Sequence, residues 1–229
     1  DLKLVQQFKT KLAEKGWLTR AWPEEYGGQN ASHIQQLIFN EEMAYRGVPV
    51  DDGGISMVGP IIMMSGTEQQ KQYFLPRIAK AEINWCQGYS EPDAGSDLAS
   101  VQTKAEEDGD DFVVNGSKIW NGAHSGADWM FMLARTDPDA PKHRGISFLL
   151  TELDGTDGVT VEKIPMMWDA YRGLVTFENV RVPKKNLVGE QDRGWYVGAA
   201  LLDFERSGVD RPARAKRVLE DLVNFCKEN

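Results

Sequence analysis

The spacing of apolar residues divides this chain into three stretches. From residue 2 to about residue 80, apolar residues recur every three or four positions, as in "LVQQFKTKLAEKGWL", "HIQQLIFNEEMAYRG" and "EQQKQYFLPRIAKA". This is the period of an amphipathic helix. The glycine-containing segments "YGG" and "VPVDDGG" separate these runs, as loops between helices do. We therefore expect a helical bundle over residues 1–82.

Between about residues 83 and 190 the pattern changes to short β-rich runs. These runs are "DFVVNG", "WMFMLART", "GISFLLTEL", "VTVEKI" and "LVTFENVRVP", and turns rich in Gly, Asp and Pro separate them. Short strands that follow one another without intervening helices favour an antiparallel barrel or sandwich over a parallel α/β sheet. Residues 83–190 are therefore predicted to form a middle antiparallel β-barrel domain.

Helical spacing returns over residues 191–229. The segment "ARAKRVLEDLVNFCKEN" is strongly amphipathic, and no later helix in this sequence can cover its apolar face. Most helices depend on such packing for their stability. We predict that residues 191–229 are the first helices of an incomplete C-terminal helical domain, completed by further residues or by another subunit. The expected class is α+β with several domains. The apolar face consists of Val218, Leu219, Leu222, Val223 and Phe225.

Charge and composition exclude several classes of partner. The formal net charge is -9 at pH 7, whereas nucleic acids and anionic membrane surfaces favour clustered Lys and Arg. No apolar run approaches the roughly 20 residues that span a bilayer, so we expect no membrane insertion. Cys86 and Cys226 lie far apart, which favours reduced thiols in the cytoplasm. The isolated His33, His124 and His143 predict no metal site.

The sequence contains no GxGxxG or GxxxxGK loop for a nucleotide. The most informative stretch is "YSEPDAGSDLAS", at the junction of the helical and β-rich regions. Pro, Asp, Gly and Ser are ordinary turn formers, so a plain turn is one interpretation. Backbone N–H groups and hydroxyls beside an aromatic wall could instead hold an oxygen-rich or phosphate-bearing ligand. The residue types alone leave both interpretations open.

Order and context add a family resemblance. The segment "YSEPDAGSDLAS", followed by "VNGSKIWNGAHSGADWMFMLARTD" and "FENVRVPKKNLVGE", resembles the acyl-CoA dehydrogenase family. The upstream "PEEYGG", "FNEEMA" and "GTEQQKQYFLPRIAKAE" are similar to its N-terminal helical domain. The resemblance implies FAD-dependent oxidation of an acyl-CoA thioester to the trans-2-enoyl-CoA, with a carboxylate taking the α-proton and the flavin N5 taking a hydride. It also implies a homo- or hetero-oligomer and an electron-transfer flavoprotein or similar acceptor.

The resemblance assigns roles to individual residues of the two central motifs. In the segment that matches the family's "SEPxxGSD" pattern, it implies that Tyr89 and Ser90 hydrogen-bond the isoalloxazine of FAD. Gly95 and Ser96 should lie against the pyrophosphate, with Ser96 also near the substrate. Trp120 of "KIWNG" should cover the flavin, where it can exclude water and lie on the path to an electron acceptor.

The chain departs from the family's "KxWxT" pattern at one position. Gly122 stands where the family has Thr, so a flavin contact normally made by a hydroxyl must come from a backbone N–H, from Asn121, or be lost. His124 could compensate, although "NGAHSG" is equally well read as a polar turn.

The resemblance also suggests the catalytic base. In most of the family it is a Glu in the C-terminal helical domain, in a part that this sequence does not include. In a subset similar to isovaleryl-CoA dehydrogenase and some sterol side-chain dehydrogenases, it lies on an earlier helix within an "ER" pair. Here "LLDFERSG" supplies Glu205 and Arg206 at that place. The alternative is an exposed Glu in a helix-surface charge network. Asp203 and Arg206 match positions that contact CoA, and Arg172 could line the same channel or be solvated.

Two other functions remain open from the sequence. The chain could be a non-catalytic partner subunit that completes another chain's site, which Gly122 favours and which Glu205 and the Gly95-Ser96 turn oppose. It could also be an acyl-CoA oxidase or a flavin monooxygenase of the same fold. A base on the earlier helix is compatible with branched, bulky or ring-bearing acyl groups.

Overall fold

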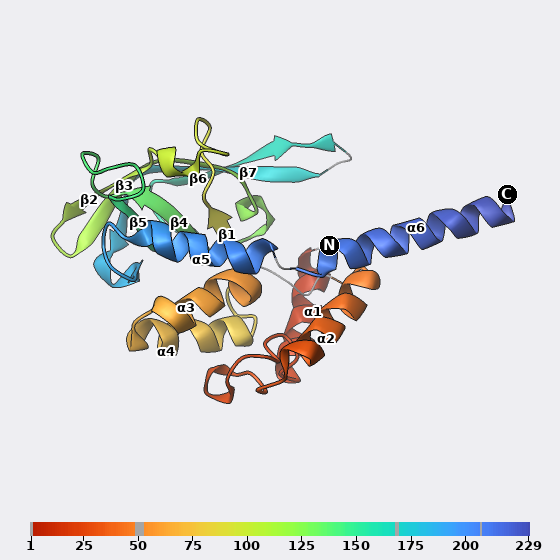
Figure 1. Cartoon of the computed structure of the whole chain (residues 1–229). Helices are drawn as coiled ribbons and strands as arrows, with labels where there is room; N and C mark the ends of the chain where they lie inside the picture. The colour runs from red at the N-terminus through yellow and green to blue at the C-terminus, as the bar shows by residue number, and fades with distance from the viewer. Residues whose placement is uncertain (1, 49–52, 168–169, 207) are drawn as a thin grey trace.

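The computed structural model describes residues 2–48, 53–167, 170–206 and 208–229. Its elements follow the predicted order of helices, β-sheet and helices (Figure 1). None of the helices in these ranges is both long enough and apolar enough to cross a bilayer.

The N-terminal part is helical, as predicted. Its α-helices are α1 (Leu2–Glu14), α2 (His33–Tyr45), α3 (Gly59–Ser65) and α4 (Glu68–Ala79), and a π-helical turn over Gly54–Val58 leads into α3. Both α2 and α4 begin with a capping box, in which the side chains of the cap residue and of the third helical residue each bond to the other's backbone N–H. In α4 these residues are Thr67 and Gln70. These local bonds explain why both helices start abruptly after loops.

Gln70 also joins the helical part to the β-domain. Its Nε2 donates to the carbonyl oxygens of Lys185 and Leu187 at 2.7 and 2.8 Å. Gln70 is buried, so these bonds satisfy an amide that would otherwise be costly to bury.

The β-domain is one 8-stranded sheet in the order β6-β7-β3-β2-β4-β5-β8, with β1 paired to β4. The predicted β-domain is thus present. The strands are β1 (Trp85–Gly88), β2 (Lys104–Asp108), β3 (Asp111–Asn121), β4 (Trp129–Arg135), β5 (Ile146–Glu152), β6 (Val159–Pro165), β7 (Tyr171–Pro183) and β8 (Leu187–Val188). Short 3-10 turns lie at Glu24–Tyr26, Leu98–Ser100, Ala123–Ser125 and Lys184–Asn186.

The sheet is mixed rather than antiparallel throughout. The β1–β4 and β2–β4 pairs are parallel, whereas the pairs β2–β3, β3–β7, β4–β5, β5–β8 and β6–β7 are antiparallel. The two parallel partners occupy successive stretches of β4: Gly88, at the end of β1, lies opposite Met132, and Lys104, at the start of β2, lies opposite Arg135. β1 and β2 therefore follow one another along the same edge of β4. The chain between them, residues 89–103, leaves the sheet and returns in the same direction.

Both faces of the central strands are buried. In β4, Phe131 and Leu133 belong to the apolar cluster under the helices, whereas Met130 and Met132 belong to the cluster on the opposite face. A strand covered on both faces carries apolar residues at successive positions. This burial explains why "WMFMLA" is continuously apolar instead of alternating.

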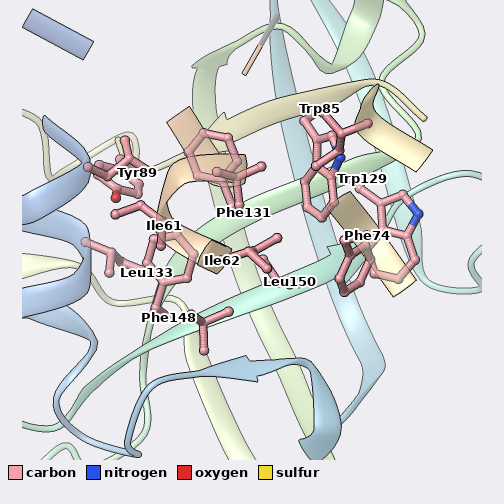
Figure 2. Close-up of a cluster of buried hydrophobic side chains, with 14 of the residues drawn as sticks. Ile61, Ile62, Phe74, Trp85, Tyr89, Trp129, Phe131, Leu133, Phe148 and Leu150 are labelled. Carbon is pink, nitrogen blue, oxygen red and sulfur yellow. The ribbon is translucent and has the colours of Figure 1, made fainter. Parts of the chain in front are cut away.

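Aromatic rings fill the cluster between the sheet and the helices, as Figure 2 shows. The rings of Phe131 and Phe148 stack with centroids 6.1 Å apart, and Tyr89 meets both rings edge-on at 6.2 and 6.5 Å. The ring of Tyr89 is thus fixed from the sheet side.

The C-terminal residues form two helices with different surroundings. Helix α5 (Gly194–Arg206) lies along the sheet and against α3, with Leu201 fully buried, while α6 (Asp210–Glu228) projects from the body of the molecule (Figure 1). Helix α6 contacts α2, where the Tyr45 hydroxyl hydrogen-bonds the Glu220 carboxylate. Its predicted apolar face is solvent-exposed, with the five side chains between 42% and 68% exposed. The domain limits at residues 82 and 190 stay predictions.

Phe131 tests the core. We expect Phe131→Ala to lower the free energy of unfolding by about 3–5 kcal/mol, because it removes a fully buried ring. Phe131→Leu keeps much of the apolar volume and should lose clearly less. Urea unfolding followed by tryptophan fluorescence measures both losses, and equal losses would contradict this description of the core.

Candidate active site

The motif "SEPDAGSD" occupies the excursion between β1 and β2. The backbones of Glu91 and Ala94 exchange hydrogen bonds of 2.8 and 3.2 Å, which close a turn around Pro92. The Ile119 N–H donates to the Ser90 carbonyl oxygen at 2.8 Å and joins the turn to β3. The turn is therefore hydrogen-bonded both within itself and to the sheet.

A buried ion pair links this turn to the "KIW" segment. Lys118 Nζ lies 2.7 Å from Glu91 Oε1 and 2.6 Å from the Leu133 carbonyl oxygen, and the two side chains are 0% and 5% exposed. The Glu91 carboxylate also accepts from the backbone N–H groups of Gln102 and Thr103, at 2.6 and 3.0 Å. One carboxylate thus joins both ends of the excursion to β3 and, through Lys118, to β4.

The ion pair determines the charge state of Glu91. Burial opposes ionisation of this carboxyl group, but the Lys118 ammonium and the two backbone donors outweigh it and hold the pKa of Glu91 below its ordinary value. Glu91 is therefore ionised at neutral pH. Sequence reasoning missed Glu91 and Lys118, because Lys118 follows Gly116 and Ser117 beyond the predicted run "DFVVNG", and its neighbours in sequence do not mark it as buried.

Several predicted site residues line one cavity. The cavity has a volume of about 500 Å³ and lies between the excursion, β1 and α5. Ligand sites of small molecules have volumes in this range. From the predicted set it gathers Tyr89, Ser90, Gly95, Ser96, Glu205 and Arg206.

The open side of the turn faces this cavity. A Cβ built on Gly95 would meet no atom within 4 Å, so the backbone there is accessible to a ligand. The neighbouring Ser90 and Ser96 carry hydroxyls, and Trp195 and Leu202 of α5 add apolar surface on the other side. The cavity thus combines polar and apolar walls, as an amphipathic ligand requires.

Tyr89 lines the cavity and also contacts α5. Its side chain is buried, and its hydroxyl donates to the Gly198 carbonyl oxygen of α5 at 3.2 Å. Burial, together with the nearby Glu205 carboxylate, raises the pKa of Tyr89 well above its ordinary value. The phenol is therefore neutral, and its single proton already has an acceptor.

Glu205 is half-buried near the end of α5 and lines the cavity. Gln87 Nε2 of β1 donates to its Oε2 at 3.0 Å. The alternative of an exposed carboxylate in a helix-surface network does not describe this environment. Gln87 is a cavity residue that the sequence analysis missed.

The remaining predicted residues lie outside this cavity. Trp120 is 53% exposed and has a left-handed backbone with φ 64°. The Asn121 amide donates to the Lys118 carbonyl oxygen at 2.9 Å and accepts from the Ala123 N–H at 3.1 Å, so it supports its own turn. Gly122 follows at the end of β3. Asp203 is exposed on α5 and is not among the cavity walls.

His124 and Arg172 lie on the same side of the β-domain. The rings of His124 and Tyr171 have centroids 6.5 Å apart, and burial followed by the charge of Arg172 lowers the pKa of His124. Arg172 is exposed and donates to the Tyr171 carbonyl oxygen at 3.2 Å. Neither residue lines the cavity, and the solvated interpretation of Arg172 fits its exposure.

A second cavity, of about 450 Å³, lies between α4, β5 and β7. Its walls include Tyr73, Phe74 and Trp129 but none of the predicted site residues. We take the cavity with Glu205 as the candidate active site because a carboxylate, two serine hydroxyls and an open glycine turn meet there.

Comparison with known families gives two matches along the chain. Residues 3–82 match the acyl-CoA dehydrogenase N-terminal domain, and residues 86–180 match the acyl-CoA dehydrogenase middle domain. The two matches together cover most of the chain. The chain belongs to the acyl-CoA dehydrogenase family.

Individual relatives are similar over nearly all of the chain. Acyl-CoA dehydrogenase FadE26 of Mycobacterium tuberculosis is 42% identical over 220 residues, which are 95% of this chain and 55% of the relative. Among solved structures, the Tcur3481-Tcur3483 steroid ACAD has a TM-score of 0.92 at 38% identity and covers 98% of this chain and 58% of that one. The ChsE4-ChsE5 complex from Mycobacterium tuberculosis has a TM-score of 0.82 at 41% identity, covering 88% and 52%. This chain therefore spans a little over half the length of these relatives.

The buried ion pair makes a stability prediction. We expect Lys118→Met to lower the free energy of unfolding by about 3–5 kcal/mol, because it leaves the Glu91 carboxylate buried without its cation. Lys184→Met is the matched control, since Lys184 pairs with Glu107 at the surface and should cost far less. Urea unfolding measures both, and equal losses would contradict the role given to Lys118.

The charge state of Glu91 makes a pH prediction. Because its folded pKa lies below the ordinary value of 4.5, its ionised form stabilises the fold above that pH, and this contribution is lost as the pH falls through the folded pKa. The difference in unfolding free energy between wild type and Glu91→Gln should be full at pH 7 and should shrink below about pH 4.5. Glu190→Gln, which alters an exposed pair with Arg193, is the control, and a gap that does not depend on pH would contradict the prediction.

Proposed function

We propose that this chain is the N-terminal and middle part of an FAD-dependent acyl-CoA dehydrogenase that converts an acyl-CoA thioester to its trans-2-enoyl-CoA. The observation that carries the proposal is the meeting of the Glu205 carboxylate with the Ser90–Ser96 turn in one cavity. More than a hundred residues separate them in the sequence. Family membership and the identity to FadE26 support the same activity.

The residues of this chain fit the flavin cofactor in their chemistry. Ser90 and Ser96 would supply hydroxyls to it, the accessible backbone at Gly95 would approach its pyrophosphate, and the exposed Trp120 would cover its ring system. Gly122 would contribute only backbone atoms, and Asn121 supports the turn beneath. When bound, FAD supplies the acceptor for the hydride that leaves the β-carbon.

Glu205 acts as the base in this proposal. A carboxylate in a partly buried cavity can remove the α-proton of a thioester if one oxygen is available to it. Trp195 and Leu202 line the cavity and would limit the access of water from the α5 side. Tyr89, which directly follows β1, joins this strand to α5 through the hydrogen bond between its hydroxyl and the Gly198 carbonyl oxygen.

Arg206 and Ser96 are proposed to contact the substrate. Arg206 brings a cation to the cavity wall, where it can pair with the phosphates of CoA. Asp203 would contact CoA from the exposed side of α5. We propose a bulky or ring-bearing acyl group, which is supported by the similarity to a structure described as a steroid ACAD.

We further propose that the chain works in the cytoplasm as part of an oligomer. The similarity to the ChsE4-ChsE5 complex and the exposed apolar face of α6 support assembly with further helices. An electron-transfer flavoprotein or similar acceptor would take up the electrons, and the exposed Trp120 supports its approach at that edge of the β-domain.

One alternative has an observation in its favour. Gly122 stands where the family's Thr would supply a hydroxyl, and the Asn121 amide is engaged in its own turn. A non-catalytic subunit that completes a partner's site could tolerate both features. An oxidase of the same fold would share every feature described above.

Glu205→Gln tests the proposed function. In the complete protein with its partner chains, we expect anaerobic acyl-CoA to bleach the flavin of wild type, and the variant to bleach about 10²–10⁴-fold more slowly while still binding substrate, since it lacks the base. Straight, branched and steroid-side-chain thioesters should be compared, with Glu190→Gln as the control. Full activity of Glu205→Gln would remove Glu205 from the mechanism. A protein without flavin in any assembly would favour the partner-subunit alternative.

A further inference from the structure

Glu205 receives a hydrogen bond from a side chain on a different element. Gln87 of β1 and Glu205 of α5 are 118 residues apart in sequence, and their Nε2 and Oε2 atoms lie 3.0 Å apart. An ionised carboxylate has no proton to donate, so the amide must present its NH₂ group to it. The orientation of the Gln87 amide therefore follows from the charge of its partner.

The strand that carries Gln87 is held rigidly. β1 pairs with β4, where Gln87 lies opposite Phe131, and both neighbours of Gln87 in sequence are buried. A Cβ on Gly88 would lie 2.2 Å from Met130 Sδ, so the strand packs against β4 without spare room. The donor atom thus starts from a fixed backbone.

Glu205 lacks such support on its own helix. It is the penultimate residue of α5, and helix ends are the least constrained part of a helix. In the described part of the chain, Gln87 is the residue that hydrogen-bonds the Glu205 side chain. Asp97 and Arg206 also line the cavity; Asp97 is paired with Lys142, and Arg206 is exposed.

We propose that Gln87 is a positioning residue for the Glu205 carboxylate. Its amide holds Oε2 and leaves Oε1 directed to the substrate. The proton of the α C–H bond would pass to Oε1, and the electron pair of that bond would form the Cα=Cβ double bond as a hydride leaves the β-carbon for the acceptor that FAD would supply when bound. The inference rests on the proposed function of Glu205 as base.

The proposal predicts a specific kinetic change. Gln87→Met keeps the length of the side chain but cannot donate, and we expect the rate constant of substrate oxidation at saturation to fall about 10- to 100-fold, the worth of a hydrogen bond to a charged group. The dissociation constant of a non-oxidisable acyl-CoA analogue should stay within about twofold, because the substrate does not lose a contact. Gln87→Asn retains the amide but is one methylene too short, and it should show the same loss.

Gln191→Met is the matched control. Gln191 Nε2 donates to Glu107 Oε1 at 2.8 Å on the surface, so this variant removes the same kind of bond away from the cavity. Its rate constant and thermal midpoint should match those of wild type.

A second readout does not depend on the activity of the flavin-loaded protein. The infrared difference between wild type and Glu205→Gln isolates the carboxylate stretching band of Glu205. We expect this band to shift in Gln87→Met and in Gln87→Asn, because the carboxylate loses its donor, and to stay in place in Gln191→Met.

The outcomes separate the two proposals. A normal rate and an unshifted band in Gln87→Met would overturn the role of Gln87 while leaving Glu205 as the base. A lowered thermal midpoint that accounts for the lost rate, with no shift of the band, would also overturn it. If Glu205→Gln itself oxidises substrate normally, the proposed function fails, whatever the Gln87 variants show.

Discussion

The site depends on the buried ion pair between Glu91 and Lys118. Removing two charges from water costs several kcal/mol for each ion, and only good geometry with further hydrogen bonds offsets that cost. Here the carboxylate has two backbone donors besides the ammonium, and the ammonium has the Leu133 carbonyl oxygen besides the carboxylate. The pair fixes the start of the turn and the end of the excursion to the same point of the sheet. The residues between these two points are therefore held close to the sheet.

This constraint acts together with the unusual edge of β4. Because β1 and β2 share that edge in succession, the chain between them must leave the sheet and return to it. The excursion ends up beside α5, where the Tyr89 hydroxyl bonds the Gly198 carbonyl oxygen and Gln87 bonds Glu205. A polar turn, a rigid strand and a helix end therefore form one cavity. The proposed base lies on α5 and receives a hydrogen bond from Gln87, whereas the proposed cofactor contacts lie on the turn that the Glu91–Lys118 ion pair joins to the sheet.

Much of the fold could be predicted because the relevant signals are local. The helical period and the capping residues Ser32 and Thr67 determine where α2 and α4 begin. The mixed parallel and antiparallel pairing could not be predicted, because the sequences of β1 and β2 do not indicate which edge of β4 each strand occupies. Of the candidate site, the resemblance predicted the turn and Glu205, and both line one cavity. It gave no reason to expect that the Tyr89 hydroxyl donates to α5 or that Asn121 supports its own turn. Such bonds depend on distance between elements, which sequence spacing does not measure.

By itself, the sequence determined the order of helices and strands, the amphipathic face of α6 and the chemical types available for catalysis. Periodicity and turn formers act over a few residues, so they are legible without a structure. Tertiary structure decided which of these residues meet. Gln87 is an ordinary polar residue of a short strand until pairing with β4 holds it within hydrogen-bonding distance of Glu205. Lys118 is an isolated charge until the fold buries it against Glu91. The physical reason is that both contacts form between elements far apart in sequence, and their energy depends on burial that exists only after the sheet and α5 have packed together.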